Sequence, residues 1–236
     1  MKRASRVGAL IVILVIPTLI IFFLKGFGQN HFKLATYIPQ IDSTTGQILV
    51  KQKKTWYGTE PDTVFRTIPP FSLTDQNGQT ITSNLTKGKV YVANFIFTRC
   101  TSICPRMSSE LTRVQSIFAN NPDVLLISHS IDPAYDTPEI LKSYANKYGA
   151  ILGKWYFLTG DEQQIYQLAK KGYFLPTQKD EEKTTPDETF THSEKLILID
   201  KEGHIRGFYD GTDKQDVDRL VLELRVLLEI YKTEPQ

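Results

Sequence analysis

The sequence has 236 residues, of which 28 are Lys or Arg and 26 are Asp or Glu, and its formal net charge at pH 7 is +2. Hydrophobic residues make up 41% and charged residues 23%, a composition that excludes a disordered or low-complexity chain. The first 25 residues hold four basic side chains and no acidic one, so the rest of the chain holds 24 basic and 26 acidic side chains. A slightly acidic body gives no support for nucleic-acid binding, and no nucleic-acid partner is expected.

An apolar run without any charge extends from Val7 to Leu24. Its 18 residues are close to the roughly 20 that a helix needs to cross a bilayer core. Three basic residues precede it, which predicts a cytoplasmic tail over 1–6, a single transmembrane anchor over 7–24, and a body on the extracytoplasmic, periplasmic-type side of the cytoplasmic membrane. A cleaved signal peptide is the alternative, although its apolar region usually has only about 7–15 residues.

The rest of the chain is predicted to be one domain preceded by a polar stretch. Residues 25–60 lack a long periodic run and are interpreted as a linker and N-terminal extension, and residues 61–236 as a single domain. Phe71–Ile81 is expected to form a hairpin that turns at Asn77-Gly78. The patterns that follow alternate between strands and helices, in this order: strand 90–97, helix 102–118, strand 124–131, helix 137–149, strand 155–158, helix 161–172, a polar insertion 176–191, and strands 195–200 and 204–209.

The final helix has the clearest pattern of all. Its apolar residues follow three- and four-residue spacing at 217, 220, 221, 224, 227, 228 and 231. Thr212 and Gln215 fit a capping box at its start. Strands connected by helices come first and an adjacent strand pair comes last. This order predicts an α/β protein with a thioredoxin-like fold, in which helices cover both faces of a mixed β-sheet.

Two cysteines, Cys100 and Cys104, come just after the strand predicted at 90–97 and open the next helix. Helix N-termini favour anions, so both thiols are expected to ionise more easily than a free cysteine. Residues at i and i+4 share a helical face, so both sulfurs should point at one site at the edge of the sheet. Two soft thiolates select soft metals, with Cu(I) the leading candidate, and the same pair can form a disulfide and exchange thiols. Two buried cysteines that only pack a helix start are the alternative.

His192 is the candidate third ligand of a copper site. In a thioredoxin-like sheet, the loop before strand 195–200 faces the helix start that carries the cysteines, and His192 lies in that loop. Because imidazole suits the harder oxidised ion, a histidine beside two thiolates can hold Cu(II) as well as Cu(I). His129 is interpreted as structural, with an indirect role near the metal left open, and Met107 as core packing. His31 and His204 are interpreted as surface residues.

The segment Phe97–Pro105, FTRCTSICP, resembles the Sco/SenC family of copper-binding cytochrome c oxidase assembly proteins. Three later segments resemble the same family: Ser130–Pro138, which follows the second core strand, Thr191–Ser193, which contains the histidine, and Gly203–Gly211, which forms the last hairpin. The resemblance spans about residues 64–230. Many members carry Asp where this chain has Thr191, and the change removes one way of orienting the imidazole.

The resemblance implies that Cys100, Cys104 and His192 are the copper ligands, with Asp187 or Glu188 as substitutes for the missing aspartate. It also implies a membrane-anchored protein that delivers copper to the binuclear centre of cytochrome c oxidase and assists its assembly, by binding and transfer rather than turnover. Its partners would be a copper-accepting oxidase subunit and an upstream copper donor or thiol reductant. Two alternatives stay open. One is a thiol–disulfide reductase that keeps a partner's copper-ligand cysteines reduced through the redox-active pair Cys100 and Cys104. The other is a copper or redox sensor.

Overall fold

A computed structural model of the chain describes residues 13–23, 34–55, 58–175 and 194–233. The chain divides into two units, Met1–Lys33 and Leu34–Gln236. In the first unit, residues 13–23 form a helix with exposed apolar side chains. Among the described residues, no helix combines the length and the apolar character needed to cross a membrane. The predicted anchor over 7–24 lies partly outside the described residues.

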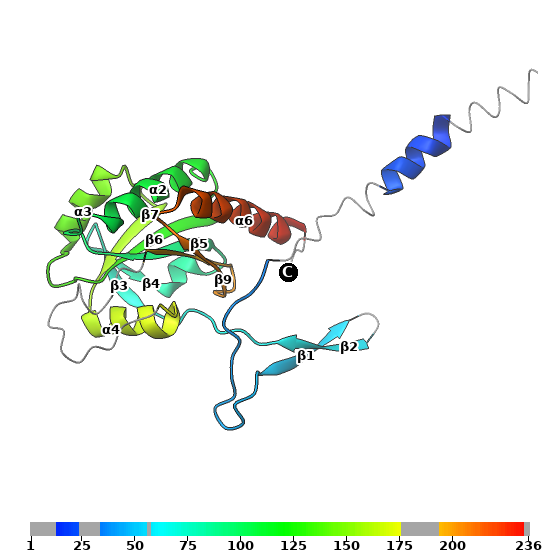
Figure 1. Ribbon diagram of the computed structural model, residues 1–236, viewed down its shortest axis with the longest axis horizontal. Coiled ribbons are helices and arrows are strands. Elements are labelled where there is room, and N and C mark those ends of the chain that lie inside the picture. The colour runs from blue at the N-terminus through cyan, green and yellow to red at the C-terminus, as the bar shows by residue number, and fades with distance from the viewer. Residues whose placement is uncertain (1–12, 24–33, 56–57, 176–193, 234–236) are drawn as a thin grey trace, which may run out of the picture. The chain divides into compact units, whose positions relative to one another are not determined.

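The second unit is built on a seven-stranded mixed sheet with the strand order β4-β3-β7-β6-β5-β8-β9 (Figure 1). Strands β5, β6 and β7 are parallel, whereas β8 and β9 on one side and β3 and β4 on the other pair antiparallel. The predicted α/β class and mixed sheet are therefore confirmed. The strands span Ser72–Asp75 (β3), Thr80–Thr82 (β4), Val90–Ile96 (β5), Val124–Ser130 (β6), Trp155–Thr159 (β7), Lys195–Ile199 (β8) and Ile205–Asp210 (β9).

Helices cover both faces of this sheet, as predicted. Helices α2 (Ile103–Ile117), α3 (Pro138–Lys147) and α6 (Lys214–Thr233) pack on one face. Helix α4 (Glu162–Gln167) and the π-helical turn η2 (Leu168–Gly172) pack on the other. A short 3₁₀ turn, η1 (Ser83–Thr86), follows β4.

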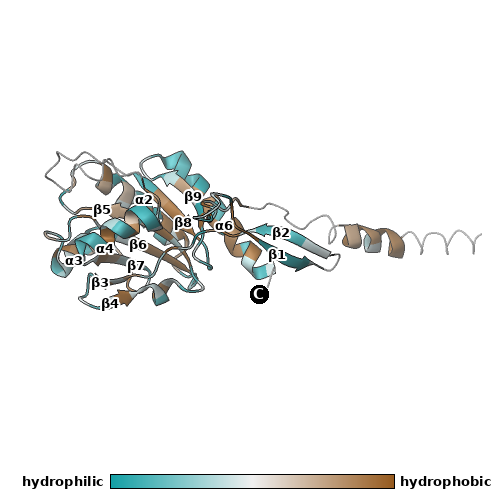
Figure 2. Ribbon diagram, turned by 90° about the horizontal axis from the view of Figure 1, so that it is seen from below, coloured by the Kyte–Doolittle hydropathy of each residue, from teal (hydrophilic) through white to brown (hydrophobic). Residues whose placement is uncertain are grey.

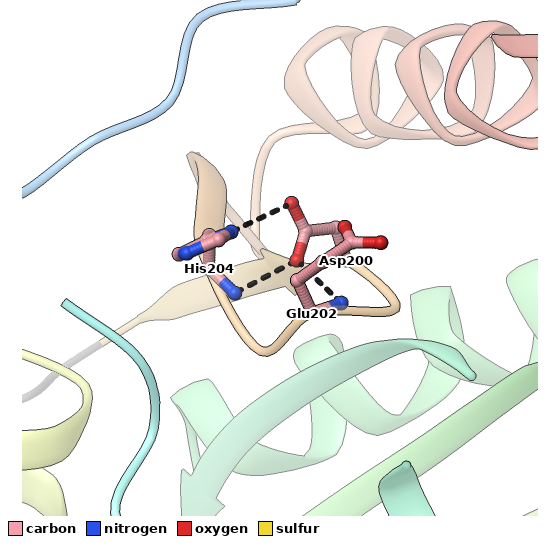
Figure 3. A group of neighbouring side chains, drawn as sticks. All are labelled: Asp200, Glu202 and His204. Carbon is pink, nitrogen blue, oxygen red and sulfur yellow. Dashed lines mark hydrogen bonds and ion pairs between the residues drawn. The ribbon is translucent and has the colours of Figure 1, made fainter. Parts of the chain in front are cut away.

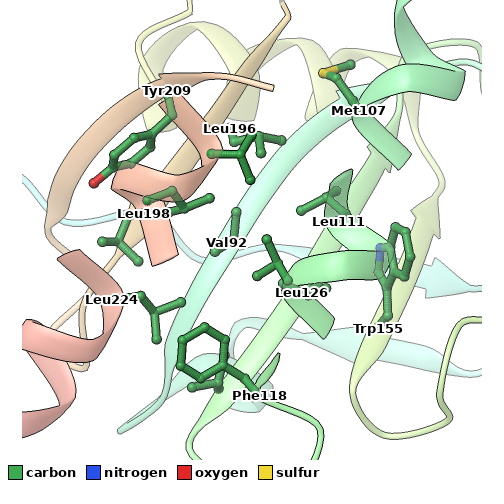
Figure 4. Packing of buried hydrophobic residues seen from close by; sticks show 14 of the residues in the cluster. Val92, Met107, Leu111, Phe118, Leu126, Trp155, Leu196, Leu198, Tyr209 and Leu224 are labelled. Atoms are coloured by element: carbon green, nitrogen blue, oxygen red, sulfur yellow. The ribbon is translucent and has the colours of Figure 1, made fainter. Parts of the chain in front are cut away.

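The core on the α2 and α6 face explains why β5 is a continuous apolar run. All seven residues of β5 and of β6 are buried, because helices cover both faces of these central strands. Figure 4 shows the side chains of Met107 and Leu111 from α2 and Leu224 from α6 packed over Val92 and Leu126 of the sheet. The helix that begins at the cysteines is therefore held by its apolar stripe, which fixes where its first turn lies.

The register of the strands brings the ends of β5 and β6 and the start of β8 to the same edge of the sheet. Ile96 at the end of β5 is paired with Ser130 at the end of β6, and the two strands run parallel. Strand β8 runs the other way, with Ile197 beside Ala93, so its first residue lies at that same edge. The turn before α2, the loop after β6 and the residues preceding β8 therefore share one end of the domain.

A hairpin that the sequence analysis does not predict lies ahead of the sheet. Strands β1 (Val50–Thr55) and β2 (Gly58–Thr63) pair antiparallel, and their residues are exposed except for half-buried Thr55 and Thr63. Figure 2 shows hydrophilic colouring along β1 and hydrophobic colouring in the central strands of the sheet. The hairpin has no apolar alternation because it buries neither face, so the usual strand signal is absent.

The start of α6 differs from the predicted capping box. The backbone N–H of Gln215 donates to the side chain of Asp213 at 2.9 Å, so Asp213 caps the helix. The amide and hydroxyl of Thr212 instead donate to Asp210, at 2.8 and 2.7 Å. The Thr212–Gln215 prediction is wrong by one residue, because Asp210 holds Thr212 in the preceding turn.

Arg206 attaches the first described residues of the second unit to the sheet. Its guanidinium donates to the carbonyl oxygens of Leu34 at 2.8 Å and Ala35 at 2.9 Å, and it forms an ion pair with Asp200 at 3.1 Å. The side chain of Asp200 is 1% exposed and that of Arg206 14%. One half-buried cation thus satisfies two carbonyl groups and one carboxylate, which fixes where the chain enters the domain.

Replacing Arg206 with Ala should destabilise the domain and release residues 34–37. The loss leaves a buried carboxylate without its guanidinium, which costs about 3 kcal/mol when a buried pair is broken. Urea unfolding of the Arg206→Ala protein measures this, and limited proteolysis locates the released segment. Lys214→Ala removes an exposed pair with Asp218 and should cost less than about 1 kcal/mol. We call the contacts of Arg206 with Leu34, Ala35 and Asp200 the clamp. Equal losses of unfolding free energy in Arg206→Ala and Lys214→Ala would contradict a stabilising role for the clamp.

Candidate thiol and metal site

The two cysteines lie on either side of the start of α2. Strand β5 ends at Ile96, and the backbone N–H of Cys100 closes the next turn by donating to the carbonyl oxygen of Phe97 at 3.1 Å. Helix α2 begins at Ile103, so Cys104 lies in its first turn and Cys100 precedes it. The prediction that both residues share a helical face is therefore wrong for Cys100. The turn nevertheless brings the pair together.

The sulfur of Cys100 accepts a hydrogen bond from the helix start. The backbone N–H of Cys104 donates to Cys100 Sγ at 3.4 Å. The first four amides of a helix lack partners within the helix, and the residue before it normally supplies an acceptor. Ser102 occupies that position, but its side chain makes no capping hydrogen bond. Cys100 Sγ therefore takes the place of the missing cap, where the helix dipole favours a thiolate.

The two thiols have different protonation chemistry. Burial tends to raise the pKa of the half-buried Cys100, but the amides of Cys104, Ser102 and Ile103 outweigh it, so this pKa lies below its usual value. Burial raises the pKa of Cys104 to about 12, with further contributions from Cys100 and Asp136. The expectation that both thiols ionise easily is confirmed for Cys100 and wrong for Cys104, because removal of Cys104 from water outweighs its place at the helix start.

The loop after β6 lies against the turn that carries Cys100. Thr137 caps α3 by accepting from the backbone N–H of Ile140, as its position predicts. Two carboxylates in this loop contact the cysteine turn: Asp136 accepts hydrogen bonds from Thr98, and Asp132 forms an ion pair with Arg99. No local pattern in the sequence predicts these contacts, because they join residues more than thirty positions apart in the chain.

His129 lies in the layer of the core opposite to Cys104. It is fully buried in β6, stacks on Phe95 with ring centroids 5.0 Å apart, and its Nε2 lies 3.3 Å from the hydroxyl of Tyr173. Burial lowers the pKa of His129 to about 3, so the imidazole is neutral. Its structural role is confirmed. Met107 is also confirmed as core, since only 1% of it is exposed.

The predicted third ligand lies outside the described residues. His192 belongs to the segment 176–193, together with Thr191, Asp187 and Glu188, and His31 also lies outside the description. Strand β8 begins at Lys195, three residues after His192, at the sheet edge where β5 ends. Among the predicted site residues, the structure thus brings Cys100 and Cys104 together.

A second group of possible metal ligands lies at the opposite edge, in the turn between β8 and β9. Ligand atoms of Asp200, Glu202 and His204 lie within 4.8 Å of one another (Figure 3). Asp200 accepts from Arg206 and lies 3.5 Å from His204 Nδ1, while Tyr231 donates to Glu202. These partners make the group part of the clamp on the N-terminal segment. The alternating spacing of these residues is visible in the sequence, but the expectation that His204 is a surface residue is wrong, because contacts within this turn leave its side chain half-buried.

Alkylation should distinguish the two thiols. With iodoacetamide near pH 8, Cys100 should react roughly tenfold faster or more than Cys104, because its thiolate is the more populated and the more accessible. Mass spectrometry of the peptides over time measures both rates. Unfolding in urea is the control and should bring the two rates together. Equal rates in the folded protein would contradict the difference in burial and pKa.

Comparison with known proteins agrees with this fold and site. A family model described as SCO1/SenC matches residues 59–228. The chain is 32% identical over 160 residues to the SCO1 protein homolog of Bacillus subtilis, covering 67% of this chain and 81% of that protein. The solved structure of BsSco, described as having a disulfide switch and as a member of the Sco family of cytochrome c oxidase assembly proteins, is 31% identical. It superimposes with a TM-score of 0.59 and covers 68% of this chain and 92% of BsSco.

A copper-bound structure is also among the similar folds. The crystal structure of Arabidopsis thaliana ScoI with copper bound is 27% identical, has a TM-score of 0.56, and covers 70% of this chain and all of that one. A thioredoxin-like sheet with two thiols at a helix start defines a class of thiol- and metal-binding proteins. Because the family model covers more than half of the sequence, the chain belongs to the SCO1/SenC family.

Proposed function

We propose that this protein binds copper as cargo through Cys100 and Cys104, with His192 as third ligand. The observation that carries the proposal is the contact between the backbone N–H of Cys104 and Cys100 Sγ, which places both thiols at one helix start. Two soft thiolates suit Cu(I), and an imidazole adds the nitrogen that Cu(II) prefers. The start of β8 at the same sheet edge, three residues after His192, supports the third ligand.

The cargo is delivered to cytochrome c oxidase in this proposal. Residues 61–236 carry the copper and assist assembly of the binuclear copper centre in a copper-accepting oxidase subunit. Residues 7–24 anchor the chain in the cytoplasmic membrane, with residues 1–6 in the cytoplasm, 25–60 connecting the anchor to the domain, and the domain on the extracytoplasmic side. The exposed apolar side chains of 13–23 support the anchor, and the basic residues that precede it support the orientation. Family membership, with BsSco described as an oxidase assembly protein, supports the partner.

Thiol exchange is a second candidate function, favoured by the different pKa values of the two thiols. The thiolate of Cys100 would attack one sulfur of a partner's disulfide, forming a mixed disulfide and releasing the other partner sulfur as a thiolate. Cys104 would then lose its proton and attack Cys100 Sγ, which frees the second partner thiol. Two electrons pass to the partner, and the Cys100–Cys104 disulfide forms. An upstream thiol reductant would restore the starting state.

The affinity for Cu(I) should increase with pH. Binding must displace the proton of Cys104 at any pH below about 12, whereas the lowered pKa of Cys100 makes its proton the easier one to displace. The dissociation constant should therefore fall by about tenfold to a hundredfold for each unit of pH between 6 and 8. Competition titrations with a Cu(I) chelator at several pH values measure this slope. A constant affinity after correction for the chelator would exclude Cys104 as a thiolate ligand.

Removing the proposed third ligand should separate the two oxidation states of copper. In His192→Ala, Cu(I) should be retained with reduced affinity, because two thiolates satisfy this soft ion. Cu(II) should be lost or should show a changed thiolate-to-Cu(II) charge-transfer absorbance. Thiol exchange should continue, since it needs no imidazole.

His204→Ala is the matched control, because it removes a half-buried imidazole at the opposite edge of the sheet. Its Cu(II) spectrum should equal that of the unmodified protein. An unchanged Cu(II) affinity and spectrum in His192→Ala would remove His192 from the ligand set. If Cys100→Ala and Cys104→Ala both bind copper as the unmodified protein does, the proposed function as a whole is wrong.

A further inference from the structure

The side chain of Asp136 is fully buried and directed at the turn before Cys100. It accepts from the backbone N–H of Thr98 at 3.2 Å, from the hydroxyl of Thr98, and from the hydroxyl of Ser130 at 2.6 Å. Thr98 is two residues from Cys100 and lies in the turn that the Phe97–Cys100 hydrogen bond closes. One carboxylate therefore joins the ends of two parallel strands.

Burying the carboxylate of Asp136 costs free energy, and packing of the core alone does not require a carboxylate at this position. Among the described residues, no basic side chain forms an ion pair with Asp136, so hydrogen bonds from Thr98 and Ser130 are its direct compensation for burial. A buried carboxylate without a cation costs free energy that an apolar side chain of similar size would not. What Asp136 provides in return is a set of three directional contacts, two of them to the same threonine. Those contacts determine the path of the backbone toward Cys100.

We propose that Asp136 is a positioning residue for the thiol site and that it acts through Thr98. By fixing the turn at 97–100, it holds Cys100 Sγ against the backbone N–H of Cys104, where both sulfurs face one metal ion or one another. The inference rests on the proposed function of this pair. Residues that orient metal ligands in this way typically contribute ten- to a hundredfold to metal affinity.

A neighbouring carboxylate offers an internal comparison. Asp132 pairs with Arg99, whose side chain is 55% exposed and lies over the ring of Tyr135 at 4.5 Å from its centroid. Arg99 adjoins Cys100, but its pair with Asp132 is solvent-exposed on the arginine side, and such pairs contribute little. The buried contact of Asp136, rather than the exposed pair, should therefore control the turn.

Three substitutions test the proposal in the full chain. Asp136→Asn keeps the shape of the side chain but replaces one acceptor oxygen with a donor. Thr98→Val removes only the hydroxyl contact, and Thr98→Ser restores it. Asp123→Asn is the matched control, since Asp123 pairs with Lys89 at 3.1 Å and Lys201 at 2.8 Å at the opposite edge of the sheet.

Each variant is measured by the alkylation rate of Cys100 at pH 7, by Cu(I) affinity and by the thiolate-to-Cu(II) charge-transfer absorbance. In Asp136→Asn, alkylation should slow severalfold as the sulfur loses the Cys104 amide, Cu(I) affinity should fall by about tenfold to a hundredfold, and the absorbance should shift. Thr98→Val should show the same changes to a smaller extent. Thr98→Ser and Asp123→Asn should match the unmodified protein.

Unchanged alkylation, affinity and absorbance in folded Asp136→Asn would overturn the proposal. Circular dichroism establishes that the variant is folded. Should Asp136→Asn fail to fold, the Thr98→Val and Thr98→Ser pair decides, because identical behaviour of these two would also overturn it. Absence of copper binding by the unmodified protein would instead reject the proposed function, while the alkylation rates would still decide the role of Asp136.

Discussion

The unpaired amides in the first turn of α2 are the constraint around which the site is organised. A helix start that follows directly from a buried strand must find acceptors close by, and Ser102 does not supply one. The sulfur of Cys100 fills that need, which ties a reactive atom to the backbone of the helix. The same contact, together with the amides of Ser102 and Ile103, stabilises a thiolate at Cys100, so the group that caps the helix is also the more reactive thiol.

Cys104 and His129 lie in different layers of the core, on opposite faces of the sheet. On the α2 face, Cys104 is buried in the first turn of the helix whose residues Met107 and Leu111 pack in the same core, so its place is fixed by that packing. On the other face, His129 is enclosed by aromatic rings and stays neutral. The imidazole nearest in sequence to the cysteines therefore lies in the opposite layer of the core from Cys104, although it is only one strand away.

The predictable part of the fold follows from burial. Strands β5 and β6 are covered on both faces, and β5 is apolar except for Asn94 while β6 opens with four apolar residues. Helix α6 shows its buried stripe by its spacing. The hairpin β1–β2 buries neither face, so its sequence lacks the alternation of apolar and polar residues that would predict its strands. Likewise, the cysteine spacing identifies the site, but the high pKa of Cys104 arises from packing that only the folded chain creates. The contact of Asp136 with Thr98 joins two separate loops and has no local signal.

The contacts of Arg206 with Leu34 and Ala35 place the point where the chain enters the domain at the opposite end of β5 from the thiols. Arg206 holds Leu34 and Ala35 beside the first residues of β9, at the edge where β5 begins. Cys100 follows the other end of β5, and a strand of seven residues is about 23 Å long. A force applied to the chain at Leu34 would therefore be taken up at the end of the domain remote from Cys100 Sγ, with the whole length of β5 between the two points.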